Sequence, residues 1–152
     1  IYDRSKGRTG YVSYEVSPLL ANDTAGTVAA AHRYATMIDR PNLMIKVPST
    51  PAGIPAIEQL ISEGRCINVT LMFSLKHYDN VAHAYIRGLE RRIADGQKVD
   101  RMHSVASFLV SRVDTATDKR IEAKIAEATA EDERSTLQAR LGKAGIANAR
   151  IA

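Results

Sequence analysis

Four short β-like runs alternate with helical patterns along the whole chain, and this alternation limits the fold more than any other feature of the sequence. The runs cover residues 11–16, 43–47, 67–73 and 104–110. Strands that alternate with helices predict consecutive βα units, with right-handed crossovers, a parallel sheet and helices outside it. The predicted fold class is therefore α/β. Four such units suit either a small open sheet or half of an eightfold barrel, and their spacing fits both.

Helix start and stop signals lie between the runs. The first helical pattern follows a capping cluster at residues 22–24 and ends near Pro41. The second begins at Gly53, has Pro55 in its first turn and stops at Gly64. Three further patterns cover residues 75 to about 95, 114 to about 130, and 131 to 144.

The composition is that of an ordinary globular protein. The 152 residues are 45% hydrophobic and 25% charged, enough for a sizeable core in one domain covering residues 1–152. The net charge of +4 comes from scattered Lys and Arg, which favours a small anionic metabolite as partner over nucleic acid. No stretch approaches the length of a membrane span, so we expect no membrane partner. The single Cys66 excludes an internal disulfide and is typical of the reducing cytoplasm. Because the chain starts at Ile1 without an initiator Met, we expect a piece of a longer protein.

Lys46 places a charged side chain in the middle of the apolar run 43–47. The common interpretation of such a lysine is a side chain that reaches solvent at a strand end. The alternative is a reactive amine, because burial disfavours the charged form and a neutral amine attacks carbonyl carbons to form a Schiff base. The neighbouring runs decide which interpretation to prefer.

Polar residues share one side of the third run. Successive strand residues point to opposite faces, so residues two apart share a face. The odd positions of the run 67–73 are all apolar and suit packing under helices: Ile67, Val69, Leu71 and Phe73. Asn68 and Thr70 are therefore predicted to point together to the other side.

The first and last runs add further polar side chains. Ser13 and Glu15 share an inward face, opposite the face of Val12, Tyr14 and Val16. Ser107 shares its face with Val105 and Leu109, and Arg112 follows at the C-terminal end of the last run. Proteins of the α/β class place their sites at the C-terminal ends of parallel strands. We therefore predict that polar groups from the four runs converge on one site: Glu15, Lys46, Asn68, Thr70 and Ser107, followed by Arg112.

These segments together resemble a known family. The run IKVPSTPAGIPAI at residues 45–57, followed by NVTLMFS at residues 68–74, resembles the Schiff-base strand and the next strand of transaldolase. Within that family, the chain resembles the actinobacterial-like form, which is sometimes fused to glucose-6-phosphate isomerase. The resemblance extends from GYVSYEV at residues 10–16 through SVASFLVSRVD at residues 104–114 to GKA at residues 142–144, in the family's order and spacing.

The resemblance implies a TIM (β/α)8 barrel, of which this chain carries the third to sixth strands. It implies transfer of a dihydroxyacetone unit from a ketose phosphate to an aldose phosphate in the pentose phosphate pathway, without metal or organic cofactor. Carried over by motif, the resemblance implies that Lys46 is the nucleophile and that Glu15 and Thr70 hold a water that shuttles protons. The same resemblance implies that Asn68 and Ser107 hydrogen-bond hydroxyls of the three-carbon unit and that Arg112 helps to bind the substrate phosphate.

The chain departs from the family pattern in two ways. Leu109 stands where relatives often have an aromatic side chain beside the substrate. The family's acid/base aspartate and a second phosphate ligand belong to strands outside this chain, so we expect it to trap a carbonyl more readily than it turns over. Half a barrel has two unpaired sheet edges, which predicts a homo-oligomer or a need for the missing half.

Two other functions fit the same residues. One is a class I aldolase of the same superfamily, which releases the three-carbon unit to water, although the long third helix and residues 97–103 favour the transaldolase form. The other is a non-catalytic phosphosugar-binding fragment in which Lys46 is only an electrostatic anchor.

Overall fold

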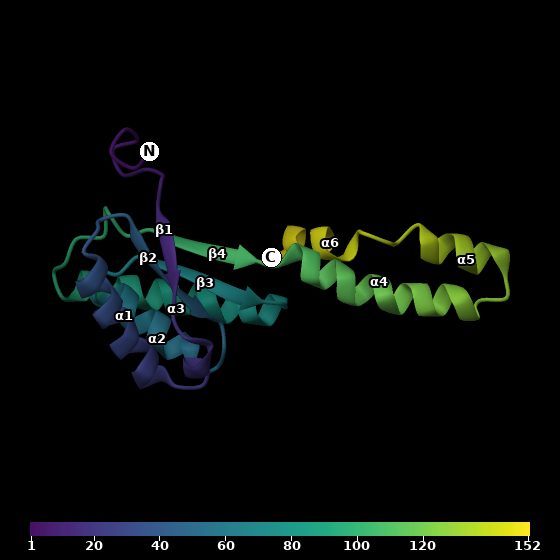
Figure 1. Cartoon of the computed structure of the whole chain (residues 1–152), viewed down its shortest axis with the longest axis horizontal. Helices are drawn as coiled ribbons and strands as arrows, with labels where there is room; N and C mark the ends of the chain where they lie inside the picture. Colours follow the sequence, from purple (N-terminus) through teal and green to yellow (C-terminus); the bar gives the residue numbers. More distant parts are fainter. The chain divides into compact units, whose positions relative to one another are not determined.

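The computed structural model describes residues 1–152, and its elements follow the predicted alternation (Figure 1). In chain order they are β1 (Val12–Glu15), η1 (Pro18–Leu20), α1 (Thr24–Ile38), β2 (Leu43–Pro48), α2 (Gly53–Ser62), β3 (Ile67–Met72), α3 (Leu75–Ala94), β4 (Ser104–Phe108), α4 (Val110–Glu127), α5 (Glu131–Gln138) and α6 (Ala144–Ile151). The strands form one sheet in the order β1-β2-β3-β4, and β2 pairs in parallel with both β1 and β3. The α/β class and the consecutive βα units are confirmed, and the arrangement is consistent with part of a barrel.

The chain divides into two compact units. Residues 1–72 and 76–107 form the first, which holds nearly all of the sheet with α1, α2 and most of α3. Residues 73–75 and 108–152 form the second, which holds α4, α5 and α6. That all 152 residues belong to one barrel domain stays a prediction. No helix in either unit is both long enough and apolar enough to cross a membrane.

The core of the first unit lies between the sheet and its helices. Residues two apart in β2 and β3 point to the helix side and are buried: Ile45, Val47, Ile67 and Val69. They meet the apolar face of α2, whose Ile57, Leu60 and Ile61 are fully buried. The close packing of α3 on α2 requires a glycine. A Cβ at Gly88 would lie 2.7 Å from the Cβ of Ile61 and 2.8 Å from the carbonyl oxygen of Glu58.

The end of β3 departs from the predicted alternation. Leu71 has a left-handed backbone with φ +61°, which interrupts the alternation of the strand at that residue. As a result Met72 is buried, whereas Phe73 is exposed. The prediction that Leu71 and Phe73 pack under the helices with Ile67 and Val69 is therefore wrong beyond Thr70.

The two edge strands are more exposed than β2 and β3, and β4 is shorter than predicted. Val12 and Tyr14 of β1 are exposed, because this strand has a neighbour on one side only. Tyr14 nevertheless faces α1, where its ring meets that of Tyr34 edge-on at a centroid distance of 4.8 Å. At the other edge β4 ends at Phe108, so Leu109 lies outside the strand and does not share a strand face with Ser107.

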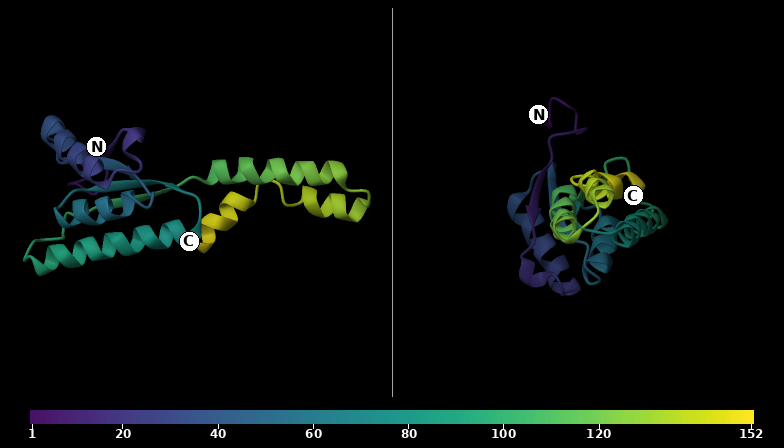
Figure 2. Two further views of the ribbon diagram at one scale, coloured as in Figure 1. Left: turned by 90° about the horizontal axis from the view of Figure 1, so that it is seen from below. Right: turned by 90° about the vertical axis from the view of Figure 1, so that its right-hand side faces the viewer.

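The second unit corrects the predicted helix boundaries. The fourth helix begins at Val110 instead of residue 114, and the single helix predicted for residues 131–144 is wrong. Gly142 has φ +68°, a left-handed conformation that breaks the helical pattern, so α5 ends at Gln138 and α6 starts at Ala144. Both short helices lie alongside α4 (Figure 2).

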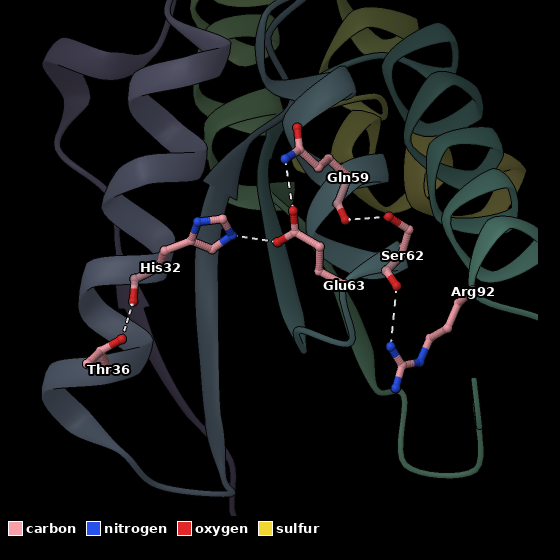
Figure 3. A network of polar contacts seen from close by, with 6 residues as sticks. All are labelled: His32, Thr36, Gln59, Ser62, Glu63 and Arg92. Atoms are coloured by element: carbon pink, nitrogen blue, oxygen red, sulfur yellow. Dashed lines mark hydrogen bonds and ion pairs between the residues drawn. The ribbon is translucent and has the colours of Figure 1, made fainter. Parts of the chain in front are cut away.

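A polar network joins α1 to the end of α2 in the first unit (Figure 3). The ring Nε2 of His32 donates to the Glu63 carboxylate at 2.5 Å, and the Gln59 amide donates to the same carboxylate at 2.8 Å. Arg92 of α3 donates to the Ser62 carbonyl at 3.3 Å. Burial alone would raise the pKa of Glu63, but the hydrogen bonds from His32 and Gln59 outweigh burial and hold this pKa below its ordinary value of 4.5.

We expect Glu63→Gln to lower the free energy of unfolding at pH 7 by less than about 1 kcal/mol, because the pair of His32 and Glu63 is partly exposed. A carboxyl group whose pKa is lowered by folding stabilises the protein above its unfolded pKa and loses that effect as the pH falls through the folded pKa. The difference in free energy of unfolding between the parent and the Glu63→Gln variant should therefore become smaller below pH 4.5. Urea unfolding at several pH values measures it. A difference that widens in acid would contradict the prediction.

Candidate active site

Three of the predicted site residues occupy one row across the sheet. Glu15 pairs in register with Lys46, and Lys46 pairs in register with Asn68. Residues in register on neighbouring parallel strands point to the same face, which here is the face opposite the helix-covered side of Ile45 and Val47. The Lys46 Nζ lies 3.1 Å from Oε2 of Glu15 and forms an ion pair with it. The amine and the carboxylate therefore come from adjacent strands and touch directly.

Asn68 forms hydrogen bonds with side chains of both edge strands of the sheet. Its Nδ2 donates to the Ser13 Oγ of β1 at 2.9 Å, and its Oδ1 accepts a hydrogen bond from the Ser107 Oγ of β4 at 2.7 Å. The Asn68 side chain thus has both its donor and its acceptor oriented by hydroxyl groups. Side chains from four different strands form two adjoining polar groups on one face.

The site is open to solvent on the side of the ion pair. The Lys46 side chain is 29% exposed and that of Glu15 is 51% exposed. The flanking residues Ile45 and Val47 are buried, so only the lysine of this strand segment has access to water. A small molecule can therefore reach the amine. No three His, Cys, Asp or Glu side chains lie close enough together to bind a metal ion.

The other two predicted residues, Thr70 and Arg112, lie outside the row of Glu15, Lys46 and Asn68. Thr70 is 3% exposed and lies two residues after Asn68 on the same strand face, in register with Pro48 of β2. Arg112 is exposed in the first turn of α4, which belongs to the second unit. The part of Arg112 in the site stays a prediction.

Ser13 and the loop after β2 belong to the site's framework but were not among the predicted site residues. Ser13 shares the inward face of Glu15, so strand alternation was the signal that pointed to it. After Lys46, the Ser49 Oγ donates to the Leu71 carbonyl at 2.8 Å, and the Thr50 Oγ1 donates to the Ala21 carbonyl at 2.5 Å. These bonds tie the end of the lysine strand to the next strand and to the loop before α1. Their carbonyl partners come from distant parts of the chain, so no local pattern identifies them.

The arrangement combines the groups that amine catalysis needs. An amine can act as a nucleophile, a carboxylate in contact with it can accept or return a proton, and an oriented amide with two hydroxyls can bind a polyol.

Comparison with known proteins identifies the family. The model of the transaldolase/fructose-6-phosphate aldolase family matches residues 1–152. Over 152 residues the chain is 50% identical to the transaldolase of Trichodesmium erythraeum and 51% identical to transaldolase 1 of Streptomyces avermitilis. It is 48% identical over 156 residues to transaldolase 2 of Nostoc sp.. All of this chain is matched in each case, but it spans only 38–40% of the length of these curated relatives. The chain belongs to the transaldolase/fructose-6-phosphate aldolase family.

Proposed function

We propose that this chain carries the Schiff-base part of a transaldolase. The reaction transfers a dihydroxyacetone unit from a ketose phosphate, sedoheptulose 7-phosphate or fructose 6-phosphate, to an aldose phosphate in the pentose phosphate pathway. The observation that carries the proposal is the 3.1 Å contact between the Lys46 Nζ and the Glu15 carboxylate, on a polar sheet face in a chain of this family. An amine that is accessible and touches a proton acceptor suits imine formation.

The first chemical step is attack of the deprotonated Lys46 Nζ on the ketose carbonyl carbon. The carbinolamine then loses water and becomes a protonated imine. Glu15 accepts the amine proton and, with Thr70, holds the water that returns it to the departing hydroxyl. The imine withdraws electrons, so the bond between C3 and C4 of the ketose breaks and its electron pair forms an enamine. The C4 hydroxyl gives its proton to the family's acid/base aspartate, which belongs to a strand outside this chain, and the aldehyde leaves. The enamine carbon then attacks the acceptor aldehyde, whose oxygen takes the proton back from that aspartate. Water hydrolyses the resulting imine, which frees the Lys46 amine and releases the new ketose.

The remaining residues bind the substrate. Asn68 and Ser107 are 2.7 Å apart and already oriented, so they can turn their hydrogen bonds toward hydroxyls of the three-carbon unit. Arg112 binds the phosphate, because its planar guanidinium presents two parallel donors to phosphate oxygens.

A second candidate is a class I aldolase that releases the three-carbon unit to water. The family's description includes fructose-6-phosphate aldolase. The aldolase reaction would use the same proposed imine at Lys46. The similar curated proteins are named transaldolases, and this favours the transaldolase reaction over the aldolase reaction. A non-catalytic phosphosugar-binding fragment is the third candidate, and in that case Lys46 does not react.

Trapping with sodium borohydride tests the proposal. The chain is incubated with fructose 6-phosphate and borohydride, its intact mass is measured and the modified peptide is mapped. We expect a three-carbon or six-carbon adduct confined to Lys46. Failure of a folded sample to form any adduct would favour the non-catalytic fragment. Release of the aldehyde product without an acceptor, at a rate equal to that with an acceptor, would favour the aldolase.

We expect Asn68→Leu to slow adduct formation by about 5- to 150-fold, since it removes hydrogen bonds worth about 1–3 kcal/mol to the substrate hydroxyls. The leucine cannot donate to Ser13 or accept from Ser107. The measurement is the rate of labelling at a fixed borohydride concentration, beside urea unfolding of the same variant. Unchanged labelling in a folded variant would remove Asn68 from the site.

We further propose that the partners are sugar phosphates in the cytoplasm, with neither nucleic acid nor membrane involved. The two edge strands, β1 and β4, support a homo-oligomer or a requirement for the rest of the barrel, because an unpaired strand edge is a template for pairing. Sedimentation of this chain alone and mixed with the remainder of a transaldolase barrel distinguishes the two.

A further inference from the structure

The second unit contains a cavity of about 530 Å³ lined by α4, α5 and α6. Its apolar wall comes from all three helices: Ile121 of α4, Leu137 of α5, and Ala144 and Ala147 of α6. No residue of α4 or α5 is fully buried, so these apolar side chains remain accessible. A cavity of this volume falls within the range of small-molecule sites, about 300–1,000 Å³.

Four cationic side chains also line this cavity. They are Arg120 and Lys124 of α4, Arg140, which follows α5, and Lys143, which precedes α6. No acidic side chain is among the lining residues. The one ion pair of the second unit joins Arg134 to Glu131, so none of the four cations forms an ion pair with a carboxylate. Four like charges around one apolar cavity repel one another and attract an anion.

Two carboxylates of α4 bind backbone N–H groups and form no ion pair with these cations. Asp118 of α4 accepts from the Gly142 N–H at 3.0 Å, and Asp114 accepts from the Gly145 N–H at 2.6 Å. These bonds anchor the loop before α6 and the start of α6 on α4. A Cβ at Gly145 would lie 2.4 Å from the Val110 carbonyl oxygen, so the helices approach closely there. The cavity is therefore held in shape by bonds that do not involve its cationic residues.

We propose that this cavity is a second ligand site that binds an amphipathic organic anion, with an alkyl or aryl body against Ile121 and Leu137 and a phosphate or carboxylate head among the four cations. Charge and apolar surface point to one ligand class. A simple inorganic anion would leave the apolar side chains of the cavity in contact with water. A cationic or neutral amphiphile would leave the four cationic side chains without a partner of opposite charge. An anion with an apolar body satisfies both.

Calorimetric titration of the full chain with three probes tests the proposal. They are decyl phosphate below its critical micelle concentration, inorganic phosphate, which is the head alone, and decyltrimethylammonium, which has the same body with the opposite charge. We expect saturable binding of one decyl phosphate per chain and at least about tenfold weaker binding of the other two. Equal binding of the two amphiphiles, or of decyl phosphate and inorganic phosphate, would overturn the proposal.

Matched variants locate the site. The double variant Lys124→Glu with Arg140→Glu should weaken decyl phosphate binding at least about tenfold. Lys119→Glu with Arg150→Glu makes the same change of charge in the same unit outside the cavity, and it should bind as the parent does. Circular dichroism checks that both fold. If Ala147→Phe, which fills the cavity without changing charge, binds decyl phosphate as tightly as the parent, the cavity is not the site. A concentration-dependent dimer that the Lys124 and Arg140 variant abolishes, without binding of decyl phosphate to the parent, would assign the surface to a protein contact and overturn the proposal.

Discussion

Replacement of Lys46 by methionine should abolish the borohydride-trapped adduct with fructose 6-phosphate. Methionine fills a similar volume but has no amine, so no imine can form to be reduced. The fold should survive, because the lost partner is a half-exposed Glu15 and such a pair contributes about 0–1 kcal/mol. Intact mass spectrometry before and after borohydride measures the adduct, and urea unfolding measures the stability.

Two control variants separate chemistry from charge. Lys46→Arg keeps a cation beside Glu15 but supplies a guanidinium that stays protonated, so it should be as unreactive as the methionine variant. Lys76→Met removes an exposed lysine at the start of α3 and should be labelled like the parent. Labelling that persists in Lys46→Met would show that another amine reacts and would refute the assignment of the nucleophile.

Truncation of Leu60 to alanine should lower the free energy of unfolding of the first unit by about 2–5 kcal/mol. Leu60 is 0% exposed and lies on the face of α2 that packs between α1 and the strands, where α2 is also held by Gly88 of α3. Removing its buried methyl groups leaves a cavity that neighbouring helices cannot fill without moving. Since natural domains are stable by only about 5–15 kcal/mol, the loss is large.

Leu19→Ala provides the matched comparison. Leu19 lies in η1 and is 91% exposed, so the same substitution should change the free energy of unfolding by less than about 0.5 kcal/mol. Urea unfolding followed by circular dichroism compares the two variants under one set of conditions. Equal effects would mean that α2 does not form the core of this unit.

The polar row was predictable because it depends on alternation and order alone. Glu15, Lys46 and Asn68 each have apolar residues on both sides in the sequence of their strand. A parallel sheet of consecutive βα units brings these three strands side by side. The order of the strands in space equals their order in the chain, so a local pattern was enough to predict which residues share a face.

Other predictions failed where a single backbone conformation changed the pattern. Because Leu71 has a left-handed backbone, Met72 is buried in the core in place of the predicted Phe73. Because Gly142 has a left-handed backbone, the one predicted helix is two helices, α5 and α6. A leucine has no intrinsic preference for positive φ, so the sequence around Leu71 did not predict its left-handed backbone. The glycine was visible in the sequence, but a helix tolerates an isolated glycine at a cost of about 1 kcal/mol, and the pattern of leucines outweighed it.

The sequence by itself determined the succession of βα units, the position of Lys46 in an apolar strand and the side on which Glu15, Asn68 and Ser107 lie, because each depends on residues a few positions apart. Only the tertiary structure decided which groups touch. The contacts of Glu15 with Lys46, and of Asn68 with Ser13 and Ser107, join residues 31 to 55 positions apart. The cavity of the second unit likewise depends on how three helices pack. Such contacts are set by the register of strands and the packing of helices, and no short segment of sequence encodes either.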